Sequence, residues 1–427
     1  MSVANEIQDL ALESEVLPLF DFTLQAQTKQ RLKALLQQTL PNATAVEAQQ
    51  NTLKALIAQH KVLGSYTYSP LYFNEVFAFL QQEHIEDLSA RTWHYRLFST
   101  RKQKHQQQSQ YKLLVLFLHK LEFNYFSRLS LTDFPEAYKR KIQGIQFFLA
   151  GFKLSGYQAA IQADAFKLSH SIALSQHVHQ LKEKGLVKAF WEDLFEFEAL
   201  LSVSIAISKN DFVFPELGAT KLLLQGFYHP ALTEPVKNDF SSNQRVNLIN
   251  GANMSGKSTF LKSISLCVYL AHLGWAVPAK KASLPFIDYF GIHLHKRDAL
   301  QQGYSHFMQE LMYFKQALLQ AQRGNSCWVV FDEFFNATNA EDARVLTQKS
   351  ITGLNQWQQG YCFIATHLLD LSQSCLSTVG TYHLACQIKE QRPAFTYRLV
   401  PGWSTLQVGQ LLFKQEGLEQ LLVQNTT

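Results

Sequence analysis

Residues 246–259 read VNLINGANMSGKST, and this stretch decides the fold of the chain. From Gly251 onward it follows the pattern G-x-x-x-x-G-K-[ST], which is the spacing of a phosphate-binding loop. A short apolar run, 246–249, precedes the loop, and an apolar pattern with helical spacing, 260–273, follows it. The order strand, loop and helix predicts an α/β P-loop NTPase and makes a chance glycine-rich turn the weaker interpretation.

Each residue type in this loop serves phosphate binding. Glycines let backbone N–H groups turn inward without obstruction, and the following helix adds free N–H groups and the positive end of its dipole. Lys257 is predicted to neutralise the β- and γ-phosphates of ATP, and Ser258 to place its hydroxyl on Mg²⁺. The predicted ATP-binding residues are Gly251, Ala252, Asn253, Met254, Ser255, Gly256, Lys257, Ser258 and Thr259.

The composition narrows the class of protein. The 427 residues are 47% hydrophobic, which is ample for packed cores in two or three domains. A net charge of +5 permits an anionic partner without requiring one. No run of about 18 apolar residues exists, so we expect no membrane span, and the N-terminus carries no secretory signal. The five cysteines form no C-x-x-C pair, which indicates a reducing compartment, and we expect a cytoplasmic location.

The chain changes character near residue 213. Residues 1–213 are predicted to form an all-α domain, and residues 214–427 the P-loop domain. Thr44 and Glu47 have the spacing of a capping box, and the Gln-rich stretch 101–110 fits either a loop tip or an exposed helix face. Helical patterns in this part cover residues 44–57, 111–126, 136–154, 158–184 and 186–207.

In the second part, strand patterns alternate with helical patterns. Alternation of this kind predicts a mostly parallel sheet with helices on both faces. Two further runs, 382–386 and 395–400, indicate a hairpin at the edge of the sheet. The strand patterns cover residues 221–225, 246–249, 289–294, 328–331 and 361–365, and the helical patterns cover 260–273, 305–323 and 340–354.

Two carboxylates follow an apolar strand pattern, as Asp332 and Glu333 come directly after residues 327–331. A strand that is apolar on both faces belongs in the middle of a sheet, and ligands bind beyond the carboxyl ends of such strands. We therefore expect Asp332 to hold Mg²⁺ and Glu333 to activate the attacking water. The alternative is a pair of solvated carboxylates at a strand end.

A second strand pattern, 361–365, ends in Thr366 and His367. A polar side chain at this strand end can sense the γ-phosphate or position the water. A single histidine is more often structural, but its place beside the other two motifs makes His367 a candidate catalytic residue together with Glu333 and Lys257.

Several segments, in this order, resemble the ATPase of the MutS family of DNA mismatch-repair proteins. Weaker likenesses extend into the helical part at 31–56 and 198–217. The segments that carry the resemblance are Tyr228-His229-Pro230, the loop 250–259, Val277-Pro278-Ala279, SHFMQE at 305–310, Asp332-Glu333, Ala365-Thr366-His367, and Pro401-Gly402 with Gly409.

The resemblance implies a fold, that of an ABC-type ATPase preceded by a helical domain, and it also implies partners. ATPases of this family act as dimers through their ATPase domains, which would bring Ser305 of one subunit to the γ-phosphate held by the other. Without the resemblance, Ser305 fits a helix N-cap, and the two roles are compatible. The helical part would be a lever that closes around DNA, with the nucleotide state setting the open or closed form. ATP and Mg²⁺ are the implied cofactors.

The sequence also departs from the family. The first residues already resemble the helical core, so we expect no N-terminal domain with a mismatch-reading Phe-x-Glu wedge, and a reduced clamp. The sequence FFNATN at 334–339 replaces a loop like Gly-Arg-Gly-Thr-Ser. Val236 occupies the position that best matches the adenine-stacking aromatic residue of the family, and Phe227, Tyr228 or Phe240 can substitute for it.

Three functions remain open on these grounds. The first is a MutS-like ATPase that drives a dimeric helical clamp on duplex or branched DNA without reading mismatches. The second is a nucleotide-switched scaffold that binds protein, with slow or no turnover. The third is an ABC-type motor with no nucleic-acid role. The sequence contains the lysine, hydroxyl, aspartate, glutamate and histidine that ATP hydrolysis needs, whichever of the three functions holds. DNA as a partner depends on the resemblance.

Overall fold

The computed structural model describes residues 6–82, 101–294, 306–335, 338–366, 378–389, 392–404, 406 and 408–424. The chain divides into two compact units. The sheet unit consists of Met1–Leu19, Gln38–Glu47 and Asn210–Thr427, and the helical unit consists of Phe20–Gln37 and Ala48–Lys209. Two short N-terminal segments therefore belong to the same unit as the phosphate-binding loop.

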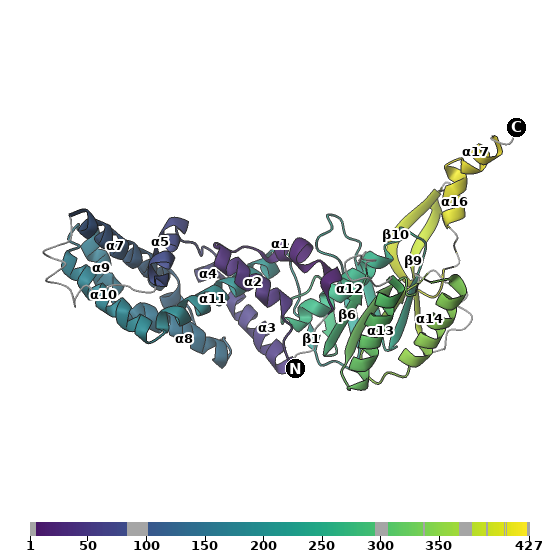
Figure 1. Cartoon of the computed structure of the whole chain (residues 1–427), viewed down its shortest axis with the longest axis horizontal. Coiled ribbons are helices and arrows are strands. Elements are labelled where there is room, and N and C mark those ends of the chain that lie inside the picture. The colour runs from purple at the N-terminus through teal and green to yellow at the C-terminus, as the bar shows by residue number, and fades with distance from the viewer. Residues whose placement is uncertain are drawn as a thin grey trace. The chain divides into compact units, whose positions relative to one another are not determined.

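Helices alone build the helical unit among its described residues (Figure 1). The long helix α11 is buried along most of its length, and α2, α8 and α10 pack against it. Its Trp191 and Phe197 are among the largest fully buried side chains. The helices are α2 (Ala26–Gln37), α3 (Ala43–Ala58), α4 (His60–Leu63), α5 (Pro70–Gln81), α7 (Arg101–Asn124), α8 (Glu136–Gly151), α9 (Leu154–Gln162), α10 (Leu168–Glu183) and α11 (Leu186–Lys209).

Three local expectations for this unit are now decided. The Gln-rich stretch is helical, because α7 begins at Arg101. The single helix expected at 158–184 is wrong, since Asp164 adopts a left-handed conformation (φ 50°) between α9 and α10. The capping box at Thr44 is also wrong. Asn42 caps the helix instead, with its Oδ1 accepting from the Ala45 N–H at 2.8 Å.

A buried carboxylate ties α2 and α11 together in this unit. Glu198 is 5% exposed, and its two oxygens accept hydrogen bonds from Thr28 Oγ1 at 2.6 Å and from the Tyr66 hydroxyl at 2.8 Å. Burial raises the pKa of Glu198, and these hydrogen bonds oppose the rise. Such bonds are what makes a buried acid tolerable in a hydrophobic core.

The sheet unit holds a six-stranded sheet in the order β10-β9-β4-β8-β7-β6. Strands β9, β4, β8, β7 and β6 run parallel, and β10 pairs antiparallel with β9. This confirms the mostly parallel sheet and the edge hairpin. The strands are β4 (Val246–Asn250), β6 (Tyr289–His293), β7 (Cys327–Asp332), β8 (Tyr361–Ala365), β9 (Gly380–Lys389) and β10 (Arg392–Pro401).

Helices cover both faces of this sheet, as its apolar strands require (Figure 1). Val329 and Phe331 of β7 face a core shared with α13 (His306–Gln322) and α14 (Ala340–Leu354). Trp328, on the other face of the same strand, donates from Nε1 to Ser265 Oγ of α12 (Lys257–His272) at 3.0 Å. Alternate residues of one strand thus pack on opposite layers.

A second sheet of four strands was not expected from the sequence. It has the order β1-β5-β2-β3 and packs against α12, where Phe227 and Phe240 contact Phe260 with ring centroids 5.5 and 6.3 Å apart. Of these strands only β2 was anticipated. The strands are β1 (Glu216–Leu217), β2 (Leu222–Phe227), β3 (Asn238–Ser242) and β5 (Lys281–Leu284), and helices α16 (Val408–Gln415) and α17 (Leu418–Gln424) end the described chain.

None of the helices in the described residues is both long enough and apolar enough to cross a membrane.

Gly360 allows β8 to start beside β7. Its φ is +89°, and a Cβ there would lie 2.3 Å from the carbonyl oxygen of Cys327. Gly360→Ala should therefore lower the free energy of unfolding by about 2 kcal/mol or more, measured by chemical denaturation. Gly353→Ala is the matched control, because a Cβ at that exposed position of α14 meets nothing within 4 Å. Equal stability of the two variants would contradict this account of the β7–β8 contact.

Candidate nucleotide-binding site

The loop between β4 and α12 needs glycine at both of its ends. Gly251 has φ +142° and Gly256 has φ +92°, conformations that residues with a side chain rarely adopt. A Cβ on Gly251 would lie 2.9 Å from Ser255 Oγ, and one on Gly256 would lie 3.0 Å from the ring of Tyr397. Both positions are thus restricted by their backbone and by their close neighbours.

Lys257 begins α12 and folds back over the loop. Its Nζ donates to the carbonyl oxygens of Gly251 at 3.0 Å and Ala252 at 3.1 Å. Burial lowers the pKa of Lys257, while the carboxylates of Asp332 and Glu333 act in the opposite direction. The ammonium group is therefore held inside the loop, where a bound anion would stabilise its positive charge.

A hydroxyl and a carboxylate meet where α12 begins and β7 ends. Ser258 Oγ donates to Asp332 Oδ2, so the structure brings together the two residues predicted to hold Mg²⁺. Mg²⁺ takes few protein ligands, all of them oxygen, and completes its shell with water and phosphate oxygens. The described residues contain no cluster of three or more His, Cys, Asp or Glu. This donor pair fits Mg²⁺.

Glu333 follows directly and has an unusual backbone. Its φ is +57°, and its N–H donates to the carbonyl oxygen of Ala365 at the end of β8, at 3.0 Å. Thr366 in turn donates its N–H to the Ile249 carbonyl at the end of β4, at 3.1 Å. Left-handed backbone at a residue other than glycine costs free energy and is concentrated at functional sites. The ends of β4, β8 and β7 are therefore held side by side.

One cavity lies beside the loop, on the side of the last described helices. It has a volume of about 330 Å³ and includes Thr366 and residues of α16. Asn250 and Ser404 both line this cavity and bind each other: the Asn250 side chain donates to the Ser404 carbonyl at 2.9 Å and accepts from the Ser404 N–H at 3.1 Å. The C-terminal segment is thereby tied to the end of β4.

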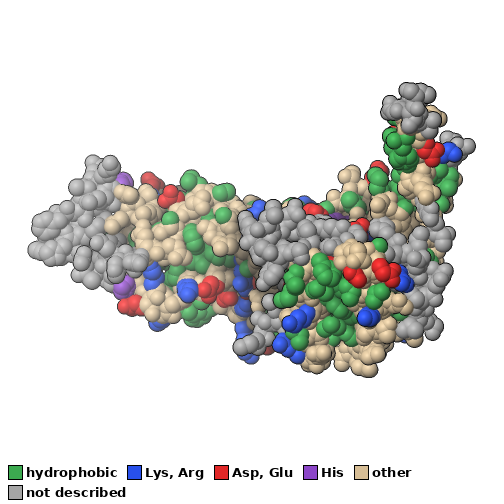
Figure 2. All heavy atoms as spheres, turned by 45° about the vertical axis from the view of Figure 1, so that its right-hand side comes forward, with side chains coloured by type: hydrophobic (Ala, Val, Ile, Leu, Met, Phe, Trp, Pro, Cys, Tyr) green, Lys and Arg blue, Asp and Glu red, His purple; other side chains and the backbone are tan. Residues whose placement is uncertain are grey.

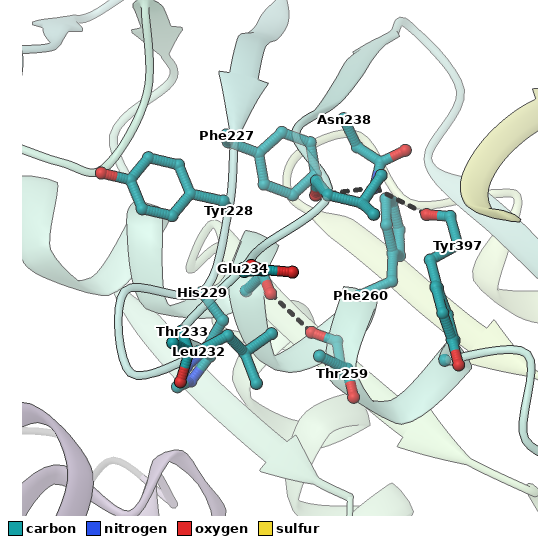
Figure 3. A pocket seen from close by; sticks show the side chains of 13 residues that line it. Phe227, Tyr228, His229, Leu232, Thr233, Glu234, Asn238, Thr259, Phe260 and Tyr397 are labelled. Carbon is teal, nitrogen blue, oxygen red and sulfur yellow. Dashed lines mark hydrogen bonds between the residues drawn. The ribbon is translucent and has the colours of Figure 1, made fainter.

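A second cavity has Gly256 in its wall (Figure 3). It has a volume of about 320 Å³, and its walls combine aromatic rings with a few polar groups, as ligand pockets commonly do. In Figure 3, Tyr397 enters from one side and the loop with His229 and Leu232 from the other. The lining residues are Phe227, Tyr228, His229, Leu232, Thr233, Glu234, Val236, Asn238, Gly256, Thr259, Phe260, Ser263 and Tyr397.

Tyr397 is the residue that sequence reasoning missed. It lies where the pairing of β10 with β9 shifts register, and its φ is +55°. Asn238 of β3 holds this irregularity, donating to the Tyr397 carbonyl at 3.0 Å and accepting from the Leu399 N–H at 2.8 Å. No local pattern marks the residue, because the side chain that holds it, Asn238, lies 159 positions away in the chain.

The four candidates for base stacking separate in the structure. Phe227, Tyr228 and Val236 line the second cavity. Phe240 does not. It packs against Phe363 and Tyr382 instead, so the structure favours the other three as stacking residues.

The structure describes most of the predicted site residues but not all of them. Gly251–Thr259 as a segment, Asp332 and Glu333 converge on one end of the sheet, as described above. Ser305 and His367 lie outside the described residues, so their predicted roles stay predictions.

Comparison with known proteins identifies the family of the C-terminal part. Residues 247–426 match the family model described as MutS domain V. Over 253 residues the chain is 28% identical to the DNA mismatch repair protein MutS of Lactococcus lactis subsp. cremoris (strain SK11), covering 56% of this chain and 30% of that protein. Over 181 residues it is 31% identical to the MutS of Streptococcus sanguinis (strain SK36), covering 42% of this chain and 21% of that protein. The matches thus span less than a third of either relative.

Proposed function

We propose that this chain, whose residues 247–426 belong to the MutS domain V family, binds Mg-ATP at the loop 251–259 and hydrolyses it. MutS domain V is an ATPase domain, and the α/β architecture described above agrees with that family. The observation that carries the proposal is the contact between Ser258 and Asp332, because it joins the loop to the acidic strand end.

Each residue of the site takes one role in this proposal. Backbone N–H groups of the loop and Lys257 bind the phosphates, and the ammonium group exchanges its loop carbonyl acceptors for phosphate oxygens. Ser258 and Asp332 would hold Mg²⁺, which supplies charge neutralisation at the β- and γ-phosphates when bound. Glu333 orients the attacking water and takes its proton. His367 is proposed as the γ-phosphate sensor.

The second cavity is proposed to take the adenine base. Gly256 and Thr259 lie in its wall, so a nucleotide whose phosphates occupy the loop can reach it. Tyr397 supplies an aromatic face beside Gly256, and Phe227, Tyr228 and Val236 supply apolar contact. Tyr397 thus replaces Phe240 among the proposed stacking residues.

Assembly and DNA binding form the finer part of the proposal. Two copies would join through their ATPase domains, with Ser305 completing the site of the other copy. Figure 2 shows hydrophobic side chains gathered on one face of the sheet unit. Met312 and Leu319 of α13, the helix that follows Ser305, are exposed, and exposed apolar residues on this helix agree with a partner that covers it. The helical unit would act as the DNA-closing lever.

A nucleotide-switched scaffold is the second candidate function, and one observation favours it. Phe334 and Phe335 follow Glu333, and both are buried, with their rings stacked 3.8 Å apart. They pack against Phe314 of α13, so the segment after the acidic pair is fixed in the core. A fixed segment at this position favours slow turnover.

Glu333→Gln should keep ATP bound while lowering the hydrolysis rate at least about a hundredfold, because the amide cannot take a proton from water. ATP affinity by calorimetry and phosphate release together measure this. Glu341→Gln is the control, since Glu341 pairs with Arg344 at 2.7 Å on the exposed surface of α14. Unchanged turnover in Glu333→Gln would exclude it as the water-activating group.

Sharing of sites between copies predicts complementation. Ser305→Ala and Lys257→Ala should each be inactive alone, because each disables both sites of its own homodimer. An equal mixture should recover about a quarter of wild-type activity, since half of the dimers are mixed and each of those keeps one intact site. Mixtures that stay inactive over a range of ratios would argue against Ser305 acting in trans.

DNA binding should weaken steeply as salt rises, because neutralising phosphates releases counterions. We expect duplex or branched DNA to bind at low salt, to stimulate ATP turnover, and to bind differently when Glu333→Gln traps the ATP form. Binding and turnover at two salt concentrations, with duplex, branched and single-stranded DNA, measure this. No binding to any of the three at low salt would rule out the DNA function and leave the scaffold and the ABC-type motor.

A further inference from the structure

The N-terminal segment, residues 6–19, is built into the sheet unit. Glu6 adds a parallel bridge beside Gly291, with its N–H donating to Phe290 and its carbonyl accepting from Ile292, each at 2.8 Å. Asp9 Oδ2 accepts from the Leu294 N–H at 2.8 Å. The segment forms two short helical turns, η1 (Gln8–Leu10) and η2 (Leu12–Val16), and runs into α1 (Leu17–Phe20).

Apolar side chains hold the same segment in place. Leu10 and Val16 are completely buried, and Leu12 is 7% exposed. Burial of this extent stabilises the docked position by several kcal/mol relative to a free terminus, at about 1.5–3 kcal/mol for each such side chain. Because the segment is anchored at both ends of η2, the side chains that η2 presents have defined positions.

Glu15 of η2 reaches two cationic or ionisable groups of the sheet unit. Its Oε1 accepts from Lys262 Nζ at 2.8 Å, and its Oε2 lies 3.7 Å from His229 Nε2. Lys262 is 12% exposed and lies on α12, the helix that begins with Lys257. His229 is 4% exposed and lines the second cavity.

His229 has a polar atom that needs a partner. Its Nε2 is buried and makes no hydrogen bond within the part of the chain that the structure describes. Burial, with the Lys262 charge nearby, lowers the pKa of His229 against the opposing effect of Glu15. The shift favours the neutral ring. In that state an Nε2–H can donate to the Glu15 carboxylate after a small movement, which relieves an unsatisfied buried donor.

We infer that Glu15 is a positioning residue of the nucleotide site: from the N-terminal segment it holds Lys262 and His229, and thereby sets the wall of the cavity that takes the base. This inference depends on the proposed function, since it assumes that a nucleotide base occupies that cavity. Glu15 does not touch the nucleotide, and it acts on base binding rather than on phosphate binding.

Through Glu15, the N-terminal segment contributes to the affinity for the nucleotide. The chain continues from Glu15 to Phe20, the first residue of the helical unit, whose carbonyl accepts from Ser202 Oγ of α11 at 2.6 Å. Only the four residues 16–19 therefore separate a contact that shapes the base cavity from an anchor on the long helix of the other unit.

The test compares MgATP with inorganic tripolyphosphate, which lacks a base. We expect Glu15→Gln to raise the Kd of MgATP about three- to fivefold and to leave that of tripolyphosphate unchanged. Glu15→Asp keeps the charge and should recover part of the loss. Glu192→Gln is the matched control, because Glu192 pairs with Lys188 on the exposed side of α11. Calorimetry gives the affinities, and thermal unfolding confirms that each variant is folded.

Tyr397→Ala separates the failure of this inference from the failure of the proposed function. This substitution should weaken the binding of MgATP and leave the binding of tripolyphosphate unchanged, because Tyr397 lines the base cavity itself. If Tyr397→Ala weakens MgATP binding and Glu15→Gln does not, Glu15 has no positioning role. The same conclusion follows if Glu15→Gln weakens the binding of both ligands equally. If Tyr397→Ala also leaves MgATP unchanged, the cavity does not take the base, and the proposed base site is wrong as well.

Discussion

The contact between Ser258 and Asp332 is the constraint on which the rest of the site depends. It joins the start of α12 to the end of β7, although β8 lies between β7 and the strand that feeds the loop. The β4–β8 and β8–β7 registers place Ile249, Ala365 and Asp332 in line across the sheet. A slip of one residue in either pairing would turn Asp332 to the other face and remove it from the hydroxyl.

The helix α12 reaches both the loop proposed to bind the phosphates and the cavity proposed to take the base. Its first residues close the phosphate-binding loop, and its Phe260 packs under the second sheet beside Phe227 and Phe240. Two residues further along, Lys262 meets Glu15 of the N-terminal segment. The helix is therefore the element through which the loop, the base cavity and the N-terminal segment are mechanically connected, and a shift of α12 would be felt at all three.

The sequence predicted the features that depend on local pattern. The loop, the apolar strands and the acidic pair follow from spacing and period, and the structure contains each of them where expected. It could not predict the second sheet, because β3 (NDFSS) and β5 (KASL) are short and half polar and gain their strand geometry from pairing with β2. Tyr397 and Glu15 were missed for the same reason. Their neighbours are distant in the chain, and the register shift and the docked segment that place them leave no periodic signal.

A crystal structure with a non-hydrolysable ATP analogue and Mg²⁺ tests the central claim most directly. The account predicts phosphates within hydrogen-bond distance of the loop N–H groups and Lys257 Nζ, and a metal at about 2.1 Å from Ser258 Oγ, with Asp332 bound to it or to its water. It also predicts the base beside Tyr397. A metal bound elsewhere, or a loop that stays empty at saturating analogue, would contradict the account.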